Sequence, residues 1–245
     1  MAYDAGSFSW DTFLATPNAG PLFKIRISCV QDPGVTDASD RVFTLHNQPI
    51  HYYVNDVYDP ASNMYCTAAG NDTNDGTTPA TPKATTQAII DTYDLEPGDV
   101  VYIDTGVYTL TANITVGAAD AGDTSGMVRF VGSTHPSGTL IDRNSTSSSA
   151  YAWHLNGSGY VSIENMRVTK GYYGVYVSSA SNCSISGCRV YGANPMGVYV
   201  SSSNYTNIRN SVIDTNSLYG VYLLSADYAD ITNNTICLNG TRQTM

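Results

Sequence analysis

The chain has 245 residues, and its 21 acidic residues outnumber its 11 lysines and arginines, for a formal net charge of −10. Such a surface is a poor partner for nucleic acid, because phosphate binding needs clustered cations. No apolar run is long enough to insert into a membrane. The low content of charged residues (13%) and the 19 tyrosines among many small polar residues indicate an extracellular or cell-surface protein.

Residues 1–47 differ in pattern from the rest of the chain. Three stretches read as strands between turns rich in Gly, Pro and Asp, namely FSWDT, FKIRISCV at Phe23–Val30 and DRVFTLHN at Asp40–Asn47. The arrangement resembles the last strands of an immunoglobulin-like or fibronectin-like sandwich. Because three strands are too few to close a sandwich, we expect a partial domain or a small antiparallel sheet docked on the remainder of the chain.

The next segment contains a run of oxygen-bearing side chains, Asn71–Gly76 (NDTNDG). Its alternating oxygen ligands before a glycine are similar to those of a calcium loop, with Asp72, Asn74 and Asp75 as candidate Ca²⁺ ligands. A full loop needs a further carboxylate, which the residues after the glycine lack. Asx turns explain the run equally well, so both interpretations stay open.

Helical spacing predicts a short helix over Ala84–Tyr93. Its Ala88, Ile89 and Tyr93 share a face that can cap an open hydrophobic core. We therefore assign residues 48–98 to a linker and an N-terminal cap.

Residues 99–245 repeat with a period of 22 to 23 residues. The motif Gly-Val-Tyr returns at Gly174, Gly197 and Gly220, and an isoleucine returns at Ile163, Ile185, Ile208 and Ile231. A period this short, with paired β-branched residues between Gly, Asn and Ser, is typical of a solenoid. Alternation of inward and outward residues places three short strands in each coil, and therefore predicts three parallel sheets.

Each coil has inward pairs and a sharp corner. The inward residues include Val161 and Ile163, Val175 and Val177, and their counterparts in the later coils; Val128 and Phe130 match the first pair in a looser coil. The corners fall at Asn165, Gly187, Asn210 and Asn233, because Asn and Gly tolerate the left-handed conformation. A stacked Asn column there can bond from coil to coil. Cys183 and Cys188 take inward positions, where buried thiols are a better interpretation than a disulfide.

This pattern resembles the right-handed parallel β-helix of the pectate-lyase-like proteins. The motif ITNNTI at Ile231–Ile236 is similar to the strand–Asn corner–strand signature that joins the second and third sheets of that family. The resemblance implies an all-β solenoid from about residue 50 onward, with Gly-Val-Tyr on the first sheet. GTRQTM follows Gly240 without a visible cap, so we expect a truncated C-terminus and a larger multidomain parent protein.

The outward column of the first sheet is the main candidate for a ligand site. Tyr176, Tyr199 and Tyr222 stand between inward pairs, and His154 falls in register one coil earlier. Coils stack at roughly 4.8 Å, so these rings form a ladder whose repeat is comparable to one sugar of a polysaccharide. In the resembling enzymes this face carries the polysaccharide groove. The candidate carbohydrate-binding residues are Tyr176, Tyr199, Tyr222, His154, Tyr173 and Tyr219.

An alternative for the same column is purely structural, since tyrosine favours strands and stacked pairs stabilise a sheet. Catalysis has less support, because glycoside hydrolysis needs two carboxylates and this column offers tyrosine and histidine. A β-elimination on uronates would need an acid–base pair and a cation. His154 and Tyr176 are the candidates for the pair, and Lys170 for the cation. Arg167 and Arg189 share an outward column on the third sheet, where we expect them to be solvated.

Three functions remain open. The favoured one is a β-helix module that contacts a polysaccharide or surface glycan through the first sheet without cleaving it. The second is a fragment of a polysaccharide lyase or, less in keeping with the residues, of a glycoside hydrolase. The third is a structural spacer or adhesin stalk, which the serine-rich turns favour.

Overall fold

The computed structural model describes residues 20–23, 26–28, 34, 36–38, 43–45 and 49–240. The chain divides into two compact units, Met1–Pro49 and Ile50–Met245.

The first unit contains two antiparallel strand pairs. Strand β1 (Gly20–Phe23) pairs with β4 (Phe43–Leu45), and β2 (Arg26–Ser28) pairs with β3 (Thr36–Ala38). This confirms the small antiparallel β segment. The strand expected at FSWDT lies outside the described residues, and the likeness to an immunoglobulin-like domain stays a prediction.

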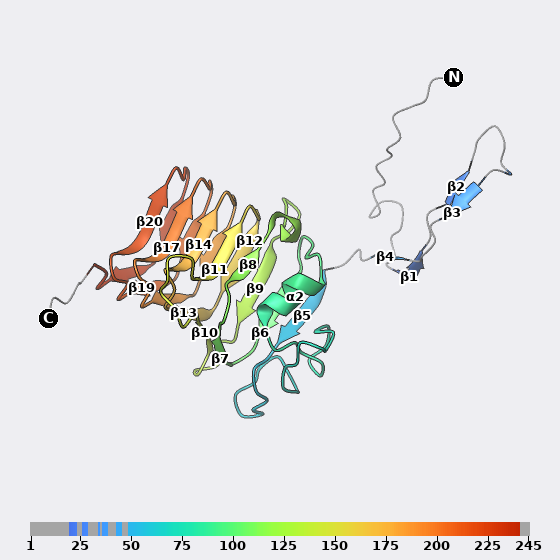
Figure 1. The fold of residues 1–245 in the computed structure, drawn as a ribbon, viewed down its shortest axis with the longest axis horizontal. Coiled ribbons are helices and arrows are strands. Elements are labelled where there is room, and N and C mark those ends of the chain that lie inside the picture. Colours follow the sequence, from blue (N-terminus) through green and yellow to red (C-terminus); the bar gives the residue numbers. More distant parts are fainter. Residues whose placement is uncertain are drawn as a thin grey trace, which may run out of the picture. The chain divides into compact units, whose positions relative to one another are not determined.

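The second unit is a right-handed parallel β-helix, whose coils stack side by side in Figure 1. The first sheet consists of β8 (Ile114–Val116), β11 (Tyr151–Asn156), β14 (Tyr173–Ser178), β17 (Met196–Ser201) and β20 (Tyr219–Leu224). The second consists of β5 (His51–Val54), β6 (Val100–Ile103), β9 (Val128–Gly132), β12 (Val161–Glu164), β15 (Ser184–Ser186), β18 (Asn207–Arg209) and β21 (Asp230–Thr232). The third consists of β7 (Gly106–Thr109), β10 (Thr139–Asp142), β13 (Met166–Thr169), β16 (Arg189–Tyr191), β19 (Val212–Asp214) and β22 (Thr235–Cys237).

The strands of each sheet pair in the register that the repeat predicts. Ile163 lies beside Ile185, Ile185 beside Ile208, and Val161 beside Val128. From β6 onward, successive strands of one sheet are three strands apart in sequence, because each coil visits the second, third and first sheets in turn.

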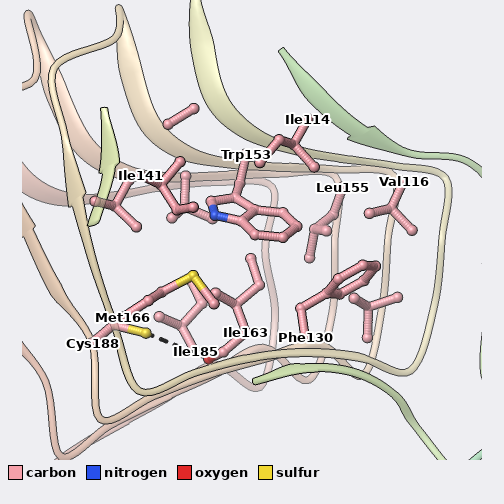
Figure 2. Close-up of a cluster of buried hydrophobic side chains, with 14 of the residues drawn as sticks. Ile114, Val116, Phe130, Ile141, Trp153, Leu155, Ile163, Met166, Ile185 and Cys188 are labelled. Carbon is pink, nitrogen blue, oxygen red and sulfur yellow. Dashed lines mark hydrogen bonds between the residues drawn. The ribbon is translucent and has the colours of Figure 1, made fainter. Parts of the chain in front are cut away.

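The core runs along the axis of the solenoid and is filled by the inward residues. Figure 2 shows Trp153 packed against Phe130, with ring centroids 5.0 Å apart and Ile141 nearby. Trp153 lies one coil before Val175 in the same inward column. Its larger side chain fills the core of the looser early coils. Full burial of each such side chain contributes about 1.5–3 kcal/mol, which makes the core the main source of stability.

A short helix covers the first coils, as predicted. Helix α2 (Thr86–Thr92) begins after Thr85, whose side chain accepts a hydrogen bond from the Ala88 amide. The buried residues differ in part from the prediction, because Ile89 and Ile90 are buried whereas Ala88 is only half-buried. A 3₁₀ turn, η1 (Ala118–Asp120), follows β8.

The corner residues adopt the predicted left-handed conformation. The side-chain hydrogen bond between coils, however, is made by the residue that follows the corner. Asn165, Gly187 and Asn210 have φ values of 54°, 65° and 52°. The coil-to-coil bond is made by the next position, where the Ser211 hydroxyl accepts from the Cys188 amide at 3.1 Å. The predicted Asn column therefore sets the turn, while the neighbouring inward side chain joins the coils.

The described cysteines form no disulfide, and Cys183 and Cys188 are buried as expected. Burial raises the pKa of Cys183 to about 11 and that of Cys188 to about 12. Neither of the helices in the described part of the chain has the length and apolar character that crossing a membrane requires.

Candidate functional site

The predicted aromatic column exists on the first sheet. His154 of β11 lies beside Tyr176 of β14, which lies beside Tyr199 of β17, and Tyr222 of β20 continues the row. Their ring centroids are 4.8, 5.0 and 5.6 Å apart along the column. The repeat therefore placed these four side chains in one row correctly.

A second column runs beside the first, three residues earlier on each strand. It contains the candidate residues Tyr173 and Tyr219 together with Met196, and it begins with Tyr151. Tyr151 stacks on Tyr173 with ring centroids 5.3 Å apart and 6° between the planes. Tyr151 was missed from the sequence, although its position three residues before His154 repeats that of Tyr173 before Tyr176. We call the two columns together the aromatic strip; its members are Tyr151, His154, Tyr173, Tyr176, Met196, Tyr199, Tyr219 and Tyr222.

The rings of the strip face each other rather than the solvent. Tyr176 is parallel to His154 (5°) and to Tyr199 (2°), so both of its faces are turned toward neighbours. Between the columns the contact of Tyr151 with Tyr176 is edge-to-face, with 65° between the planes, whereas Tyr219 and Tyr222 are stacked at 27°. In this herringbone arrangement the electron-poor ring edges contact the electron-rich ring faces within the strip itself. The strip therefore presents ring edges and phenol hydroxyls, and the parallel stacking ends at Tyr222, whose ring is tilted by 44° from that of Tyr199.

The strip carries little charge. His154 Nε2 lies 3.0 Å from the Ser178 hydroxyl, and burial lowers the pKa of His154. Burial raises the pKa of Tyr173 to about 12. Neutral imidazole and phenol groups are suited to exchanging hydrogen bonds with hydroxyl groups.

The three candidate catalytic residues do not form an acid–base site. His154 and Tyr176 stack and share no hydrogen bond. The Lys170 ammonium forms an ion pair with Asp142 of β10 at 2.8 Å, on the third sheet. The predicted trio is thus separated, since its cation is already held by a carboxylate.

The third-sheet arginines share a column as predicted, but they differ in their partners. Arg189 binds Asp214 through two hydrogen bonds of 3.0 and 2.8 Å, and its guanidinium lies over the Tyr191 ring. Arg167 donates to the Ser137 carbonyl. Arg189 is exposed, as expected, but it is not an isolated charge, because it pairs with the buried Asp214.

The acidic run at residues 71–76 is organised around a lysine. The buried Lys83 ammonium donates to the carbonyl oxygens of Asp72 and Asn74 at 2.9 and 2.7 Å. The Asp72 carboxylate accepts from the amides of Ala84 and Thr85. These contacts use the oxygens of the expected calcium ligands.

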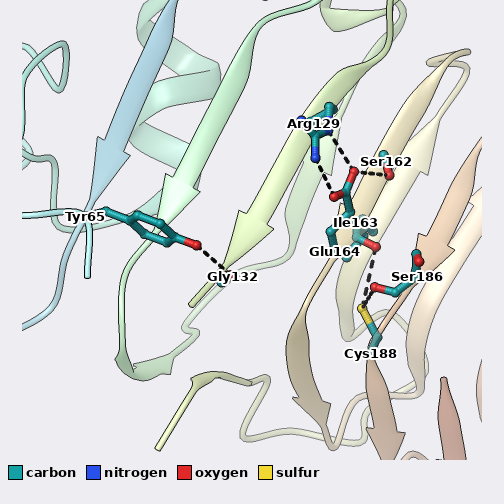
Figure 3. Close-up of polar contacts among 8 residues, drawn as sticks. All are labelled: Tyr65, Arg129, Gly132, Ser162, Ile163, Glu164, Ser186 and Cys188. Carbon is teal, nitrogen blue, oxygen red and sulfur yellow. Dashed lines mark hydrogen bonds and ion pairs between the residues drawn. The ribbon is translucent and has the colours of Figure 1, made fainter. Parts of the chain in front are cut away.

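Two charged groups of the second sheet, Arg129 and Glu164, also form a pair. In Figure 3, Arg129 binds Glu164 through two hydrogen bonds of 2.9 and 2.7 Å, and Ser162 donates to the same carboxylate. Burial favours the neutral acid, but the bonds from Arg129 and Ser162 outweigh it and lower the pKa of Glu164. The same view shows the Tyr65 hydroxyl donating to the Gly132 carbonyl.

Among the residues that the structure describes, no group of three or more His, Cys, Asp or Glu side chains is arranged to hold a metal ion. For Asp75, the third expected calcium ligand, the partners are the Thr77 amide and the Thr81 hydroxyl.

Two solved structures align with parts of this chain. Pectate lyase Pel9A aligns over 80% of this chain and 56% of its own, with 15% sequence identity and a TM-score of 0.54. An alginate lyase from Paenibacillus sp. str. FPU-7 aligns over 58% of this chain and 53% of its own, with 17% identity and a TM-score of 0.47. The chain thus spans about half the length of these structures. The likeness to the pectate lyase shows the fold alone.

The search of curated proteins found no match. A protein family, in contrast, matches residues 110–242, which is more than half of the chain and includes the whole aromatic strip. The chain belongs to the family described as periplasmic copper-binding protein (NosD).

Proposed function

We propose that this protein is a β-helix module of the cell envelope that binds an extended polysaccharide along the aromatic strip without cleaving it. The observation that carries the proposal is the strip itself, which continues over four strands of one sheet from β11 to β20. An envelope location agrees with the periplasmic description of the family.

The chemistry of the strip favours a glycan. Its rings repeat from coil to coil with centroid separations of 4.8 to 5.6 Å, which are comparable to the advance of one sugar in a chain. Sugar hydroxyls both donate and accept hydrogen bonds, as phenols do. Ring edges around these hydroxyls supply apolar contact, as tyrosine does at many interfaces. Binding by hydroxyl groups rather than by ring faces follows from the herringbone packing.

Copper, which the family description names, does not fit the buried thiols and the histidines of the matched region. Cys183 and Cys188 are buried thiols with raised pKa values, and each donates to a backbone carbonyl. Copper prefers thiolates, thioethers or neutral imidazoles gathered at one point. His135 and His154 each bond to a serine, Ser137 and Ser178 respectively. We therefore assign copper to none of these residues.

The test is a glycan array probed with the full chain, followed by calorimetry on each glycan that binds. Tyr199→Ala and Tyr199→Phe probe the middle of the strip. Because a neutral hydrogen bond contributes about 0.5–1.5 kcal/mol, removal of the hydroxyl alone is expected to weaken binding roughly twofold to tenfold. Tyr199→Ala should weaken it further.

Tyr228→Phe is the matched control, because Tyr228 is 72% exposed and lies outside the strip. It should bind like the wild type. Binding that survives Tyr199→Ala would remove the strip from the proposal. An array without any bound glycan would favour the structural spacer. Release of unsaturated uronate from an acidic polysaccharide, lost in His154→Ala, would instead favour a lyase.

A further inference from the structure

A groove on another part of the solenoid gathers positive charge. It is lined by the turn of residues 133–139 and by the corner between the second and third sheets, and has a volume of about 350 Å³. His135, Arg167 and Arg189 all line it. Arg167 and Arg189 are direct neighbours on β13 and β16, so their side chains emerge one coil apart.

These three side chains keep donors that the described residues do not use. The Nδ1 atom of His135 accepts from the Ser137 amide at 3.2 Å, which places the proton of the neutral ring on Nε2. Arg189 binds Asp214 with Nε and Nη2, which leaves Nη1. Arg167 uses Nη2 on the Ser137 carbonyl, and its Nε is buried without a hydrogen-bond partner among the described residues. A buried donor without a partner is costly, so an acceptor at this place would stabilise the groove.

A groove lined by cationic side chains is unusual for an acidic protein. Three other cations of the second unit have partners: Arg129 pairs with Glu164, Lys170 with Asp142, and Lys83 with backbone carbonyls. Arg167 forms no ion pair within the described part of the chain. Two carboxylates, Asp56 and Asp59, line a hollow on its other side, but they accept from the nearby amides of Val107 and Ala61.

We propose that this groove binds an oxyanion, with Arg167 as its principal ligand and Arg189 and His135 as further donors. The chemical class is a carboxylate, sulfate or phosphate group, which a planar guanidinium binds with paired hydrogen bonds. The groove is formed by the second and third sheets, so this site is separate from the aromatic strip and does not depend on glycan binding there.

The experiment is calorimetric titration of the full chain with three anions, namely galacturonate, inorganic sulfate and inorganic phosphate, and with galactose as the neutral counterpart of galacturonate. Saturable binding of at least one anion, and none of galactose, is expected. A preference for galacturonate would identify a sugar acid as the source of the oxyanion. A preference for sulfate or phosphate would identify an inorganic ion or its ester.

Arg167→Gln should weaken binding roughly tenfold or more, because it removes charge-assisted hydrogen bonds. Arg167→Lys should retain part of the affinity. The control is Arg209→Gln, which removes the same charge from an exposed arginine of β18 outside the groove. It should lose much less affinity than Arg167→Gln, because the Arg209 side chain does not line the groove.

A shift of the His135 ring resonances during the titration of the wild type would place the anion in the groove without relying on a variant. Equal losses in Arg167→Gln and Arg209→Gln would overturn the proposal, since they would indicate general electrostatic attraction. Failure of all three anions to bind at millimolar concentration would overturn it as well.

Discussion

The imidazole of His154 and the phenol ring of Tyr176 lie parallel, with 5° between their planes and 4.8 Å between their centroids. This stacking covers one face of each ring and leaves His154 half-buried. The imidazole forms a hydrogen bond with the Ser178 hydroxyl. His154 is therefore better placed to order the strip than to exchange protons with a substrate.

The protein should lose stability on acidification, in part through His154. Burial lowers the pKa of this histidine below its ordinary value of 6.5, so the unfolded chain binds the proton at a higher pH than the folded chain does. Unfolding is therefore favoured as the pH falls below about 6.5. Urea unfolding between pH 7.5 and 5 should show a smaller decrease in His154→Gln than in the wild type. Equal decreases would mean that the imidazole is not desolvated.

The asparagine at position 216 should be among the most sensitive residues of the coils. It is buried, and its side chain accepts from the Ala193 amide and donates to the Val190 carbonyl. Asn216→Ala leaves both backbone groups unpaired in the interior, at about 1–3 kcal/mol each. Chemical denaturation should show a loss of roughly 2–5 kcal/mol.

The neighbouring Ser217→Ala provides the comparison, because the Ser217 hydroxyl donates to the Asn194 side chain near the surface. Its expected loss is below about 1 kcal/mol. Similar losses in the two variants would show that the Asn216 bonds do not join the coils.

The pair of Arg189 and Asp214 should be more important than an ordinary surface ion pair. The Asp214 side chain is 10% exposed and that of Arg189 is 48% exposed, so the carboxylate depends on the arginine for its charge partner. Arg189→Gln should cost about 1–2 kcal/mol, between the values for exposed and buried pairs. In a double-mutant cycle with Asp214→Asn, the second substitution should cost less when the first is present. Strict additivity would indicate that the two groups do not interact.

The register of the solenoid could be predicted because its signal is repeated. An inward isoleucine every 22 or 23 residues fixes which side chains share a column, so the repeat alone is enough to place Tyr176 beside Tyr199. Ring orientation could not be predicted in this way. It depends on side-chain rotamers, which the neighbouring coil sets through stacking.

Contacts that do not follow the repeat could not be predicted from the sequence either. Asp214 lies one coil after Arg189, but the repeat does not show that the two side chains pair, and only the fold shows that the carboxylate is buried. Lys83 lies outside the run of residues 71–76, so no pattern in the sequence places its ammonium among the oxygens of that run. A lone lysine carries no periodic signal.

The Lys83 ammonium should stabilise its loop as a bound cation would. Its bonds to the Asp72 and Asn74 carbonyls hold the loop beside β5, and its side chain is buried. Lys83→Met keeps the length of the side chain but leaves both carbonyls without this donor, so a loss of about 1–3 kcal/mol is expected. Proteolysis within residues 71–76 should become faster. Lys170→Met is the control, because Lys170 forms a half-exposed ion pair whose removal should cost less than about 1 kcal/mol.

A chelator should leave the melting temperature of the wild type unchanged, since the loop oxygens already have protein partners. A lower melting temperature in the chelator, restored by Ca²⁺, would instead support the calcium loop that the sequence suggested.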